Sequence, residues 1–502
     1  MIFSSIFFLY VFLPITLLLY FLMPKPGKNI VLLIVSLIFY AWGEPIYVFL
    51  MLFSIIFNYL TGMEIEAYRE EGEERRVRFC FWLAVGVNLG LLGFFKYYGF
   101  FLENLNAILP FDIPYKELPL PVGISFYTFQ TMSYVIDVYQ KKYEPETNIF
   151  RLALFTAYLP QLLQGPIGRY DRLAPQLFEP HDFNLKNIEY GAQRIAWGLA
   201  KKLILADRAY VFSKAVFADL NTYSGMYVIV ALLTFSIYEY CDFSGGIDVV
   251  IGVSELFGIR LDENFRQPYF SKSIGEFWRR WHITLGTWMK DYIFYPFSIS
   301  KKMLAFGKKA KKIFGKKTGK ILPICAANLL IFFVVGVWHG AAWKYIIYGL
   351  YNGLIIAASN LLKPYYAKWA AVCHVNTESR GWKTFQIFRT FILVNIGWLF
   401  DACATATTAF YAMRAVFINF KISILTDGSL YKLGLVKRDW TILIVATIIL
   451  FISSVMKEKG MSLRDFVAER PLVVRWAVYL ILIFATAPFG YVSSSTEFMY
   501  AQ

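Results

Sequence analysis

Histidine is the residue type whose placement in this chain points most directly to chemistry. Only four histidines occur among 502 residues, and His181 and His374 lie among polar or turn-forming residues, as solvated loop side chains do. His339 differs, because it follows the apolar run LLIFFVVGVW and precedes GAAW. An ionisable side chain at membrane depth is a functional candidate by default, since its burial is costly. The alternative is a core histidine satisfied by a neighbouring hydroxyl or carbonyl group.

The second candidate, His282, lies in the segment GEFWRRWHITLGTW, residues 275–288. This segment predicts one helix, in which Glu276 and Arg280 have the i, i+4 spacing of an ion pair. On such a helix His282 shares a face with Trp278 or Arg279. The alternative is an interfacial helix, with tryptophans at the lipid headgroups and arginines that extend to the interface.

Other familiar catalytic patterns do not occur in the sequence. There is no GxSxG elbow, no phosphate-binding G-x-x-x-x-G-K-[ST] loop and no HExxH pattern. Five widely spaced cysteines form no CxxC pair, so the sequence predicts neither a metal site nor a disulfide framework. Two histidines without an evident protein nucleophile suit general-base catalysis. An imidazole then takes the proton from a substrate hydroxyl that attacks a bound acyl group.

Two carboxylates, Asp242 and Asp248, flank the glycines of the motif DFSGGID. The motif predicts a broken helix, where a carboxylate either orients an imidazole or caps the next helix. We favour capping, because Asp and Ser are good N-caps. The run PQLLQGP, residues 160–166, predicts a second break, at membrane depth.

The composition indicates that these residues are positioned by membrane helices. The chain is 58% hydrophobic and 17% charged, with mean hydropathy +0.50, whereas soluble domains carry about 25% charged residues. A span needs about 20 apolar residues, so this chain can form about a dozen. Disordered, collagen-like, coiled-coil and small disulfide-rich proteins are excluded on the same grounds.

Twelve apolar blocks predict an all-α polytopic membrane protein, with roughly 11 to 13 spanning or re-entrant helices. The blocks lie near residues 2–23, 30–42, 46–62, 79–101, 121–138, 150–167, 226–241, 321–337, 343–362, 384–400, 439–455 and 472–490. The mixed polar and apolar segments 151–222 and 242–300 predict a cavity in the middle of the chain.

The basic charge is concentrated in one segment. Of the net charge of +15, nine units come from the nine lysines of residues 301–320, which contain no acid, and +6 remains for the rest. Loops that follow the positive-inside rule account for that excess, so no nucleic-acid partner is predicted. We expect the lysine-rich loop 301–320 to face the cytoplasm and anionic membrane lipid, with the N-terminus outside.

Seven motifs together resemble the membrane-bound O-acyltransferase (MBOAT) family, and within it the bacterial alginate O-acetyltransferase branch. They are PVGISFYTFQTMSYVIDVY (121–139), PQLLQGPI (160–167), DFSG (242–245), ENFRQPY (263–269), EFWRRWHITL (276–285), DYIF (291–294) and VWHGAAW (337–343).

The resemblance implies a multi-pass enzyme of the bacterial plasma (inner) membrane, with helices around a central tunnel or funnel. It implies that His339 is the catalytic residue and His282 the second active-site residue. Arg280, Asp291, Asp242, Trp338 and Trp281 are the supporting or substrate-binding candidates. One membrane domain is expected over 1–502, with N-terminal spans in 1–120, a catalytic core in 121–350 and C-terminal spans in 351–502.

The resemblance also implies the substrates and a partner. An acyl group, most often acetyl, would pass from a cytoplasmic donor such as acetyl-CoA or an acyl-carrier thioester to an extracytoplasmic polysaccharide. No tightly bound cofactor is expected, and a secreted or membrane-anchored SGNH-type acyltransferase would complete the transfer.

Departures from the alginate pattern leave the acceptor open. Gly246 and Ile247 interrupt the usual DFSGYSD, and residues 296–300 replace the usual turn after DYIF. Alginate, another secreted polysaccharide, cellulose and peptidoglycan therefore all remain candidates. The alternatives for the whole protein are D-alanyl transfer to teichoic acid, and a transporter or flippase of an acylated or lipid-linked glycan precursor.

Overall fold

The computed structural model describes residues 3–491, and within them the regular elements are all helices, as predicted. Two shorter apolar helices cover Phe8–Leu22 and Leu472–Thr486. Seven longer helices have the length and apolar composition to cross a membrane: Lys25–Gly43, Tyr47–Glu70, Glu74–Asn106, Met226–Leu256, Lys301–His339, Trp343–Val372 and Lys437–Glu458. These nine helices coincide with nine of the twelve apolar blocks. The prediction of an all-helical polytopic membrane protein is confirmed.

The other three apolar blocks form shorter or more polar helices. The helix α5 (Ile124–Tyr139) buries most of its side chains, and α17 (Arg380–Ala402) carries several charged and polar residues. The block 150–167 gives α6 (Ile149–Ala157) and α7 (Leu159–Leu162), after which the chain continues without regular helix through buried residues. The break predicted at 160–166 is confirmed.

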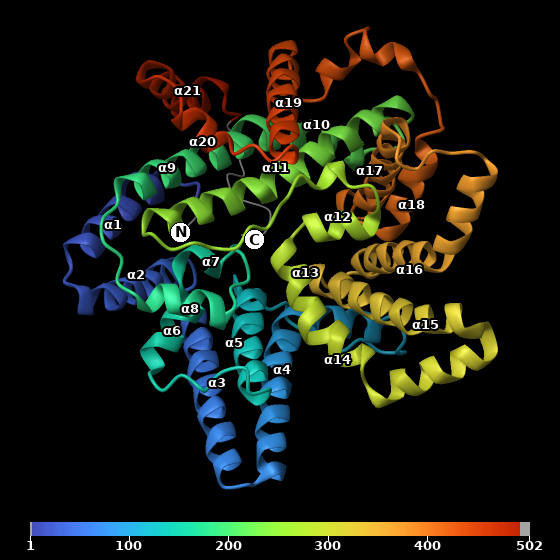
Figure 1. Ribbon diagram of the computed structural model, residues 1–502. Coiled ribbons are helices and arrows are strands. Elements are labelled where there is room, and N and C mark those ends of the chain that lie inside the picture. Colours follow the sequence, from blue (N-terminus) through green and yellow to red (C-terminus); the bar gives the residue numbers. More distant parts are fainter. Residues whose placement is uncertain (1–2, 492–502) are drawn as a thin grey trace. The chain divides into compact units, whose positions relative to one another are not determined.

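The chain folds as two compact units, and the first comprises residues up to 203 together with 241–262 and the residues from 464 onward. Long helices α3 and α4 pack against each other and against α5 in this unit (Figure 1). Its elements are η1 (Phe8–Phe12), α1 (Leu13–Leu22), η2 (Lys25–Gly27), α2 (Lys28–Gly43), α3 (Tyr47–Glu70), α4 (Glu74–Asn106), α5 to α7, α8 (Tyr170–Phe178), α9 (Leu185–Ala200), the second half of α11 (Met226–Leu256), α20 (Leu463–Ala468) and α21 (Leu472–Phe489).

Glycines bring α9 and α11 into backbone contact in this first unit. A Cβ at Gly198 would lie 2.5 Å from the carbonyl oxygen of Gly245, and one at Gly191 would lie 2.7 Å from that of Gly252. The glycines of each helix are seven residues apart, about two turns, so both lie on the face of the helix that meets the partner. Gly245 of the DFSGGID motif therefore serves helix packing.

Buried ion pairs accompany this helix crossing. Lys201 and Lys202 open the π-helix η3 (Lys201–Ala206), and both are buried. The Nζ atom of Lys202 lies 2.6 Å from Oδ1 of Asp242, and that of Lys201 lies 2.7 Å from Oδ2 of Asp248. Because α11 runs unbroken through both carboxylates, the predicted helix break and the predicted capping role of Asp242 are wrong. Glycine marks a close helix contact here, where the sequence suggested a break in the helix.

The second unit comprises residues 204–240 and 263–463 and contains both candidate histidines. Its elements are α10 (Asp207–Ala218), the first half of α11, η4 (Pro268–Phe270), α12 (Ile274–Arg280), α13 (Ile283–Met289), η5 (Lys290–Phe294), α14 (Tyr295–Ser298), α15 (Lys301–His339), α16 (Trp343–Val372), α17, α18 (Ala406–Ala415), η6 (Ile422–Leu425), η7 (Ser429–Lys432) and α19 (Lys437–Glu458).

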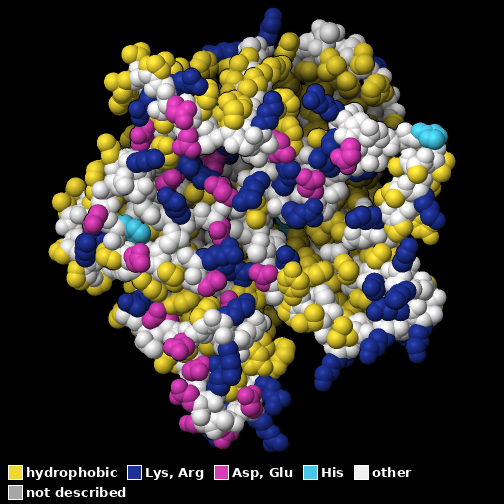
Figure 2. Space-filling view, viewed as in Figure 1, with side chains coloured by type: hydrophobic (Ala, Val, Ile, Leu, Met, Phe, Trp, Pro, Cys, Tyr) yellow, Lys and Arg dark blue, Asp and Glu magenta, His cyan; other side chains and the backbone are white. Residues whose placement is uncertain are grey.

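The lysine-rich segment is helical, whereas a loop was predicted. It begins α15, which kinks at Gly315 (φ 80°) and folds back on itself. A Cβ at Gly319 would lie 2.4 Å from Cα of Lys311, and one at Gly307 would lie 3.2 Å from Pro323, so the two arms are antiparallel. We call residues 301–323 the lysine hairpin. All nine of its lysines are exposed, and basic side chains stand out from this region at the lower right of Figure 2.

Candidate active site

His282 lies at a break between two short helices. The helix α12 ends at Arg280 and α13 begins at Ile283. The His282 backbone between them is left-handed, with φ 46° and ψ 55°. Residues with a Cβ seldom adopt this conformation, and those that do concentrate at functional sites. The single helix predicted over 275–288 is therefore wrong.

Tertiary pairing explains this break, which no glycine or proline marks. The residues before η4 run beside the end of α12, and the amide of Arg266 donates to the carbonyl oxygen of Arg280 over 2.9 Å. Next to this bond, Phe265 and Trp281 form an isolated antiparallel bridge. The bond to Arg280 and the bridge to Trp281 take over backbone groups that a continuous helix would use, which ends α12.

Trp281 anchors the break in an aromatic cluster. Its indole is 2% exposed, and ring centroids lie 5.0 Å away for Phe265, 5.1 Å for Trp398 and 5.4 Å for Phe277. Aromatic pairs at such distances add about 0.5–1.5 kcal/mol each beyond their burial. Trp281, a supporting candidate from the sequence, thus packs in the core immediately before His282.

Asn264 receives the first amides of α13. The amide of Ile283 donates to the Asn264 backbone oxygen over 3.1 Å, and that of Thr284 donates to Asn264 Oδ1 over 2.9 Å. The Thr284 hydroxyl reaches the same Oδ1 atom over 2.9 Å, and His282 Nδ1 lies 3.3 Å from it. Asn264 therefore caps α13 from a distant segment and also contacts the candidate imidazole.

The surroundings of His282 keep its imidazole neutral. The side chain is 3% exposed, and burial lowers its pKa to about 3, with a smaller lowering from the nearby His339. Its ordinary pKa is about 6.5, so the buried ring carries no charge near neutral pH. A neutral imidazole has one nitrogen able to accept a proton, which is what a general base requires.

His339 is the last residue of α15 and is half-buried. The hairpin of α15 and α16 holds it through another glycine contact, since a Cβ at Gly349 would lie 2.1 Å from the carbonyl oxygen of Phe332. Close packing brings two rings of α16 to His339, with centroids 6.1 Å away for Tyr345 and 5.6 Å for Tyr348. Tyr345 also fills the space that a side chain at Gly340 would need, because a Cβ at Gly340 would lie 2.5 Å from the phenol ring.

Trp338 contacts both candidate histidines. Its ring centroid lies 5.6 Å from that of His282 and 5.1 Å from that of His339. Its side chain is 5% exposed. The two imidazoles, which are 57 residues apart in the sequence, therefore meet at one buried indole within the second unit.

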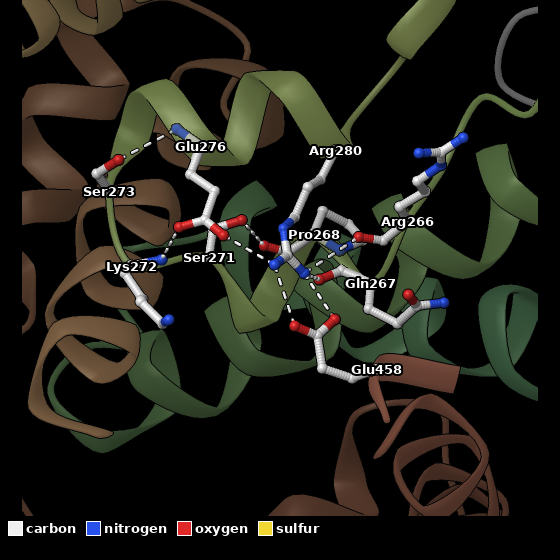
Figure 3. A network of polar contacts seen from close by, with 9 residues as sticks. All are labelled: Arg266, Gln267, Pro268, Ser271, Lys272, Ser273, Glu276, Arg280 and Glu458. Atoms are coloured by element: carbon white, nitrogen blue, oxygen red, sulfur yellow. Dashed lines mark hydrogen bonds and ion pairs between the residues drawn. The ribbon is translucent and has the colours of Figure 1, made fainter. Parts of the chain in front are cut away.

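Arg280, two residues before His282, makes ion pairs with two glutamates. Its guanidinium binds Glu458 at the end of α19 through two bonds, of 2.7 and 3.0 Å, and Glu276 through a third contact of 2.8 Å (Figure 3). The ion pair predicted from the i, i+4 spacing is confirmed. The same guanidinium donates to the backbone oxygen of Gln267 over 3.4 Å. Arg280 thus ties α12 to α19 and to the segment that follows Asn264.

The two remaining carboxylate candidates lie in different places. Asp291 is half-buried on η5, directly after α13. Asp242 belongs to the first compact unit, where Lys202 binds it. Among residues 3–491, no three His, Cys, Asp or Glu side chains converge as a metal site would require.

Sequence reasoning missed Asn264, Tyr345, Tyr348 and Glu458 as neighbours of the candidate site. Asn264 lies inside the motif ENFRQPY, but nothing in the sequence indicates that it contacts His282 and Thr284. The tyrosines recur at positions three and six after Ala342, which places both near the start of the helix that follows His339. That spacing is the one feature of the sequence from which their position beside His339 could have been predicted.

The sequence of this chain is similar to those of several known proteins. Residues 146–400 match the sequence profile of MBOAT, the membrane-bound O-acyltransferase family. The probable alginate O-acetylase AlgI of Pseudomonas syringae is 35% identical over 80% of this chain and 72% of its own length. The peptidoglycan O-acetyltransferase of Helicobacter pylori is 30% identical over 83% and 80%. The teichoic acid D-alanyltransferase of Bacillus subtilis is 29% identical over 49% and 60%.

Proposed function

Because this chain belongs to the membrane-bound O-acyltransferase family, we propose that it moves an acetyl group to a hydroxyl of an extracytoplasmic glycan, or to a partner protein that completes the transfer. The general function follows directly from the family: the chain is a multi-pass membrane O-acyltransferase. The transporter alternative is not retained, because the relatives are named as acetyl and alanyl transferases.

The chemistry that we propose needs one base and no protein nucleophile. The acceptor oxygen attacks the thioester carbonyl carbon, a C–O bond forms, and the C–S bond breaks. An imidazole takes the hydroxyl proton and then returns a proton to the departing thiolate, so the ring is regenerated. Acyl transfer by this route consumes one thioester and yields one ester and one thiol.

The two histidines divide this work in our proposal. His339 is the general base or acid, and the buried, neutral His282 completes the pair and positions the substrate. The single observation that carries this proposal is the contact of both imidazoles with Trp338. Arg280, Trp281 and Trp338 support the site, while Asp291 is a candidate for the donor side.

The donor in this proposal is acetyl-CoA or an acyl-carrier thioester, bound as a substrate from the cytoplasm. The acceptor polysaccharide meets the acyl group from outside, and an SGNH-type acyltransferase, secreted or anchored in the membrane, completes the transfer. The enzyme would lie in the bacterial inner membrane with its N-terminus outside. The lysine hairpin would then face the cytoplasm, and a reporter fused near Lys312 would behave as cytoplasmic.

Loss of either histidine tests the proposed reaction. The full chain would be expressed in cells, and base-labile acetate would be measured in their extracted envelope polysaccharide. His339→Ala should lower acetylation by about 10² to 10⁴-fold, as loss of a general base does, and His282→Ala should be severely impaired. His374→Ala is the matched control, because His374 is exposed on a loop. Near-normal acetate with His339→Ala would overturn the proposal.

D-alanyl transfer to teichoic acid is the second candidate, favoured by the Bacillus subtilis relative. It uses the same ester chemistry but a different acyl group. Mild alkali would then release D-alanine instead of acetate from the envelope.

A further inference from the structure

We infer that Asn264 is a positioning residue for the proposed acyl transfer, and that it fixes His282 in the tautomer with hydrogen on Nδ1. Nε2 is then the nitrogen with the lone pair, which can accept a hydrogen bond from a substrate hydroxyl. The inference rests on the proposed function for its catalytic consequence, but the hydrogen-bond geometry that carries it is independent of any substrate.

The backbone N–H of Thr284 determines the orientation of the Asn264 side-chain amide. The atom 2.9 Å from the backbone nitrogen of Thr284 must be an acceptor, because a backbone N–H can only donate. The atom facing Thr284 is therefore the Oδ1 oxygen of Asn264, and the amide cannot be flipped. The hydroxyl of Thr284 reaches the same oxygen.

The tautomer of His282 follows from this orientation. Nδ1 lies 3.3 Å from Asn264 Oδ1, and an amide oxygen offers no hydrogen, so the hydrogen of this bond belongs to Nδ1. A neutral imidazole carries only one N–H, which leaves Nε2 with the lone pair. The bond to Nδ1 is the longest of the three that Oδ1 receives, as expected for a shared acceptor.

The same residue also sets the orientation of the ring. The backbone oxygen of Asn264 binds the Ile283 amide, so Asn264 contacts His282 and both residues that follow it. The left-handed backbone at His282 is thereby held on the side that leads into α13. A ring held in this way keeps one rotamer, in contact with Trp338. Fixed side-chain rotamers keep an enzyme's rate high, because small misplacements of the groups at a site lower it.

Three variants separate positioning from mere capping. Asn264→Leu has similar volume but no acceptor, Asn264→Asp keeps an acceptor and adds a charge, and Thr284→Val removes only the hydroxyl donor. Thiol release from acetyl-CoA would be followed with detergent-purified full-length chain and extracted envelope polysaccharide. We expect Asn264→Leu to lower kcat by about 100-fold with KM for acetyl-CoA changed by less than about threefold, and Thr284→Val to remain within about threefold of wild type.

The charge in Asn264→Asp gives a readout that capping alone does not change. A carboxylate beside Nδ1 favours the imidazolium ion, so the loss of kcat that follows protonation of His282 should occur at a pH about one unit higher than in wild type. From α15 the titratable ring that faces His282 is His339. At the end of α12, two residues before His282, Arg280 is already engaged by Glu276 and Glu458.

Thermal melting extends the test to a protein that shows no acyl transfer. Acidification should lower the melting temperature of Asn264→Asp less than that of wild type, because the variant accommodates a charged His282. The same pH dependence of melting in both proteins would overturn the inference, as would an Asn264→Leu variant with kcat within threefold of wild type. Failure of wild type to release thiol from acetyl-CoA would instead contradict the proposed donor, and the melting result would still decide the role of Asn264.

Discussion

The phenol ring of Tyr345 stacks on the imidazole of His339, with 6.1 Å between ring centroids and 19° between ring planes. The same phenol occupies the space that a side chain at Gly340 would need. One tyrosine therefore orients the candidate catalytic ring and also restricts the residue that follows it.

The first prediction concerns this stack. Tyr345→Ala removes a ring beside His339, and we expect about 10 to 100-fold less acyl transfer, since small misplacements of catalytic groups are costly. Tyr345→Phe keeps the ring and should retain most activity. Gly340→Ala should damage the wild-type protein by its clash, but much less in the Tyr345→Ala background. Equal damage in both backgrounds would show that the two sites do not interact.

The second prediction concerns acid stability and His282. Folding lowers the pKa of this imidazole to about 3, so the unfolded chain binds the proton more readily than the folded one. Stability from the neutral ring is fully present above pH 6.5 and is lost as pH falls toward 3, by about 1.4 kcal/mol per unit. Melting of His282→Gln should therefore depend less on pH between 7 and 4.5 than melting of wild type. His374→Gln, an exposed control, should follow wild type.

The third prediction concerns the contact of Arg280 with Glu458. Glu458→Gln weakens a two-bond ion pair that is partly shielded from water, and we expect a loss of about 1 kcal/mol. Melting should fall by a few degrees, with several-fold lower activity, because the pair ties α12 to α19. Glu378→Gln is the matched control, since Glu378 binds Lys383 on an exposed surface. Identical effects of the two variants would remove any special role for Glu458.

The fourth prediction concerns the side of the membrane from which His339 is reached. From Lys316 the helix takes 23 steps to His339, roughly 34 Å at 1.5 Å per residue, which exceeds a hydrocarbon core of about 30 Å. With the lysine hairpin in the cytoplasm, single cysteines at Ala341 and Ala342 should react with a membrane-impermeant maleimide added outside. Lys312→Cys should react only from the cytoplasmic face.

The background for that labelling needs one substitution above all. Cys373 is exposed, while the other four native cysteines are buried, so Cys373→Ser removes the competing thiol. Gly340 is unsuitable for a probe because of its contact with Tyr345. Labelling of Ala341→Cys and Ala342→Cys from the cytoplasmic face alone would contradict transfer across the membrane.

Hydropathy and spacing predicted the helices and the position of His339 after an apolar run, because both depend on local composition. The long apolar runs became the seven candidate spans, and the run before His339 became the end of α15. Local spacing also predicted the pair of Glu276 with Arg280. These features depend on residues within a few turns of one another.

The features that the sequence did not predict depend on distant partners. The break at His282 depends on hydrogen bonds from the segment that contains Asn264. The glycines of α11 are explained only by the close approach of α9, which the sequence does not show. The charged segment 301–320 was predicted as a loop between membrane spans, but a tight hairpin keeps every lysine exposed and allows a helix. Each case needed knowledge of which chain segments meet.

The contact between Lys202 and Asp242 restricts how this protein can change over generations. Both side chains are almost wholly enclosed, and removal of one partner from such a pair costs about 3–5 kcal/mol, because the other charge stays buried. A variant that loses only one of the two residues would therefore fold poorly. The two codons should therefore be inherited or replaced together, although 39 others separate them in the chain.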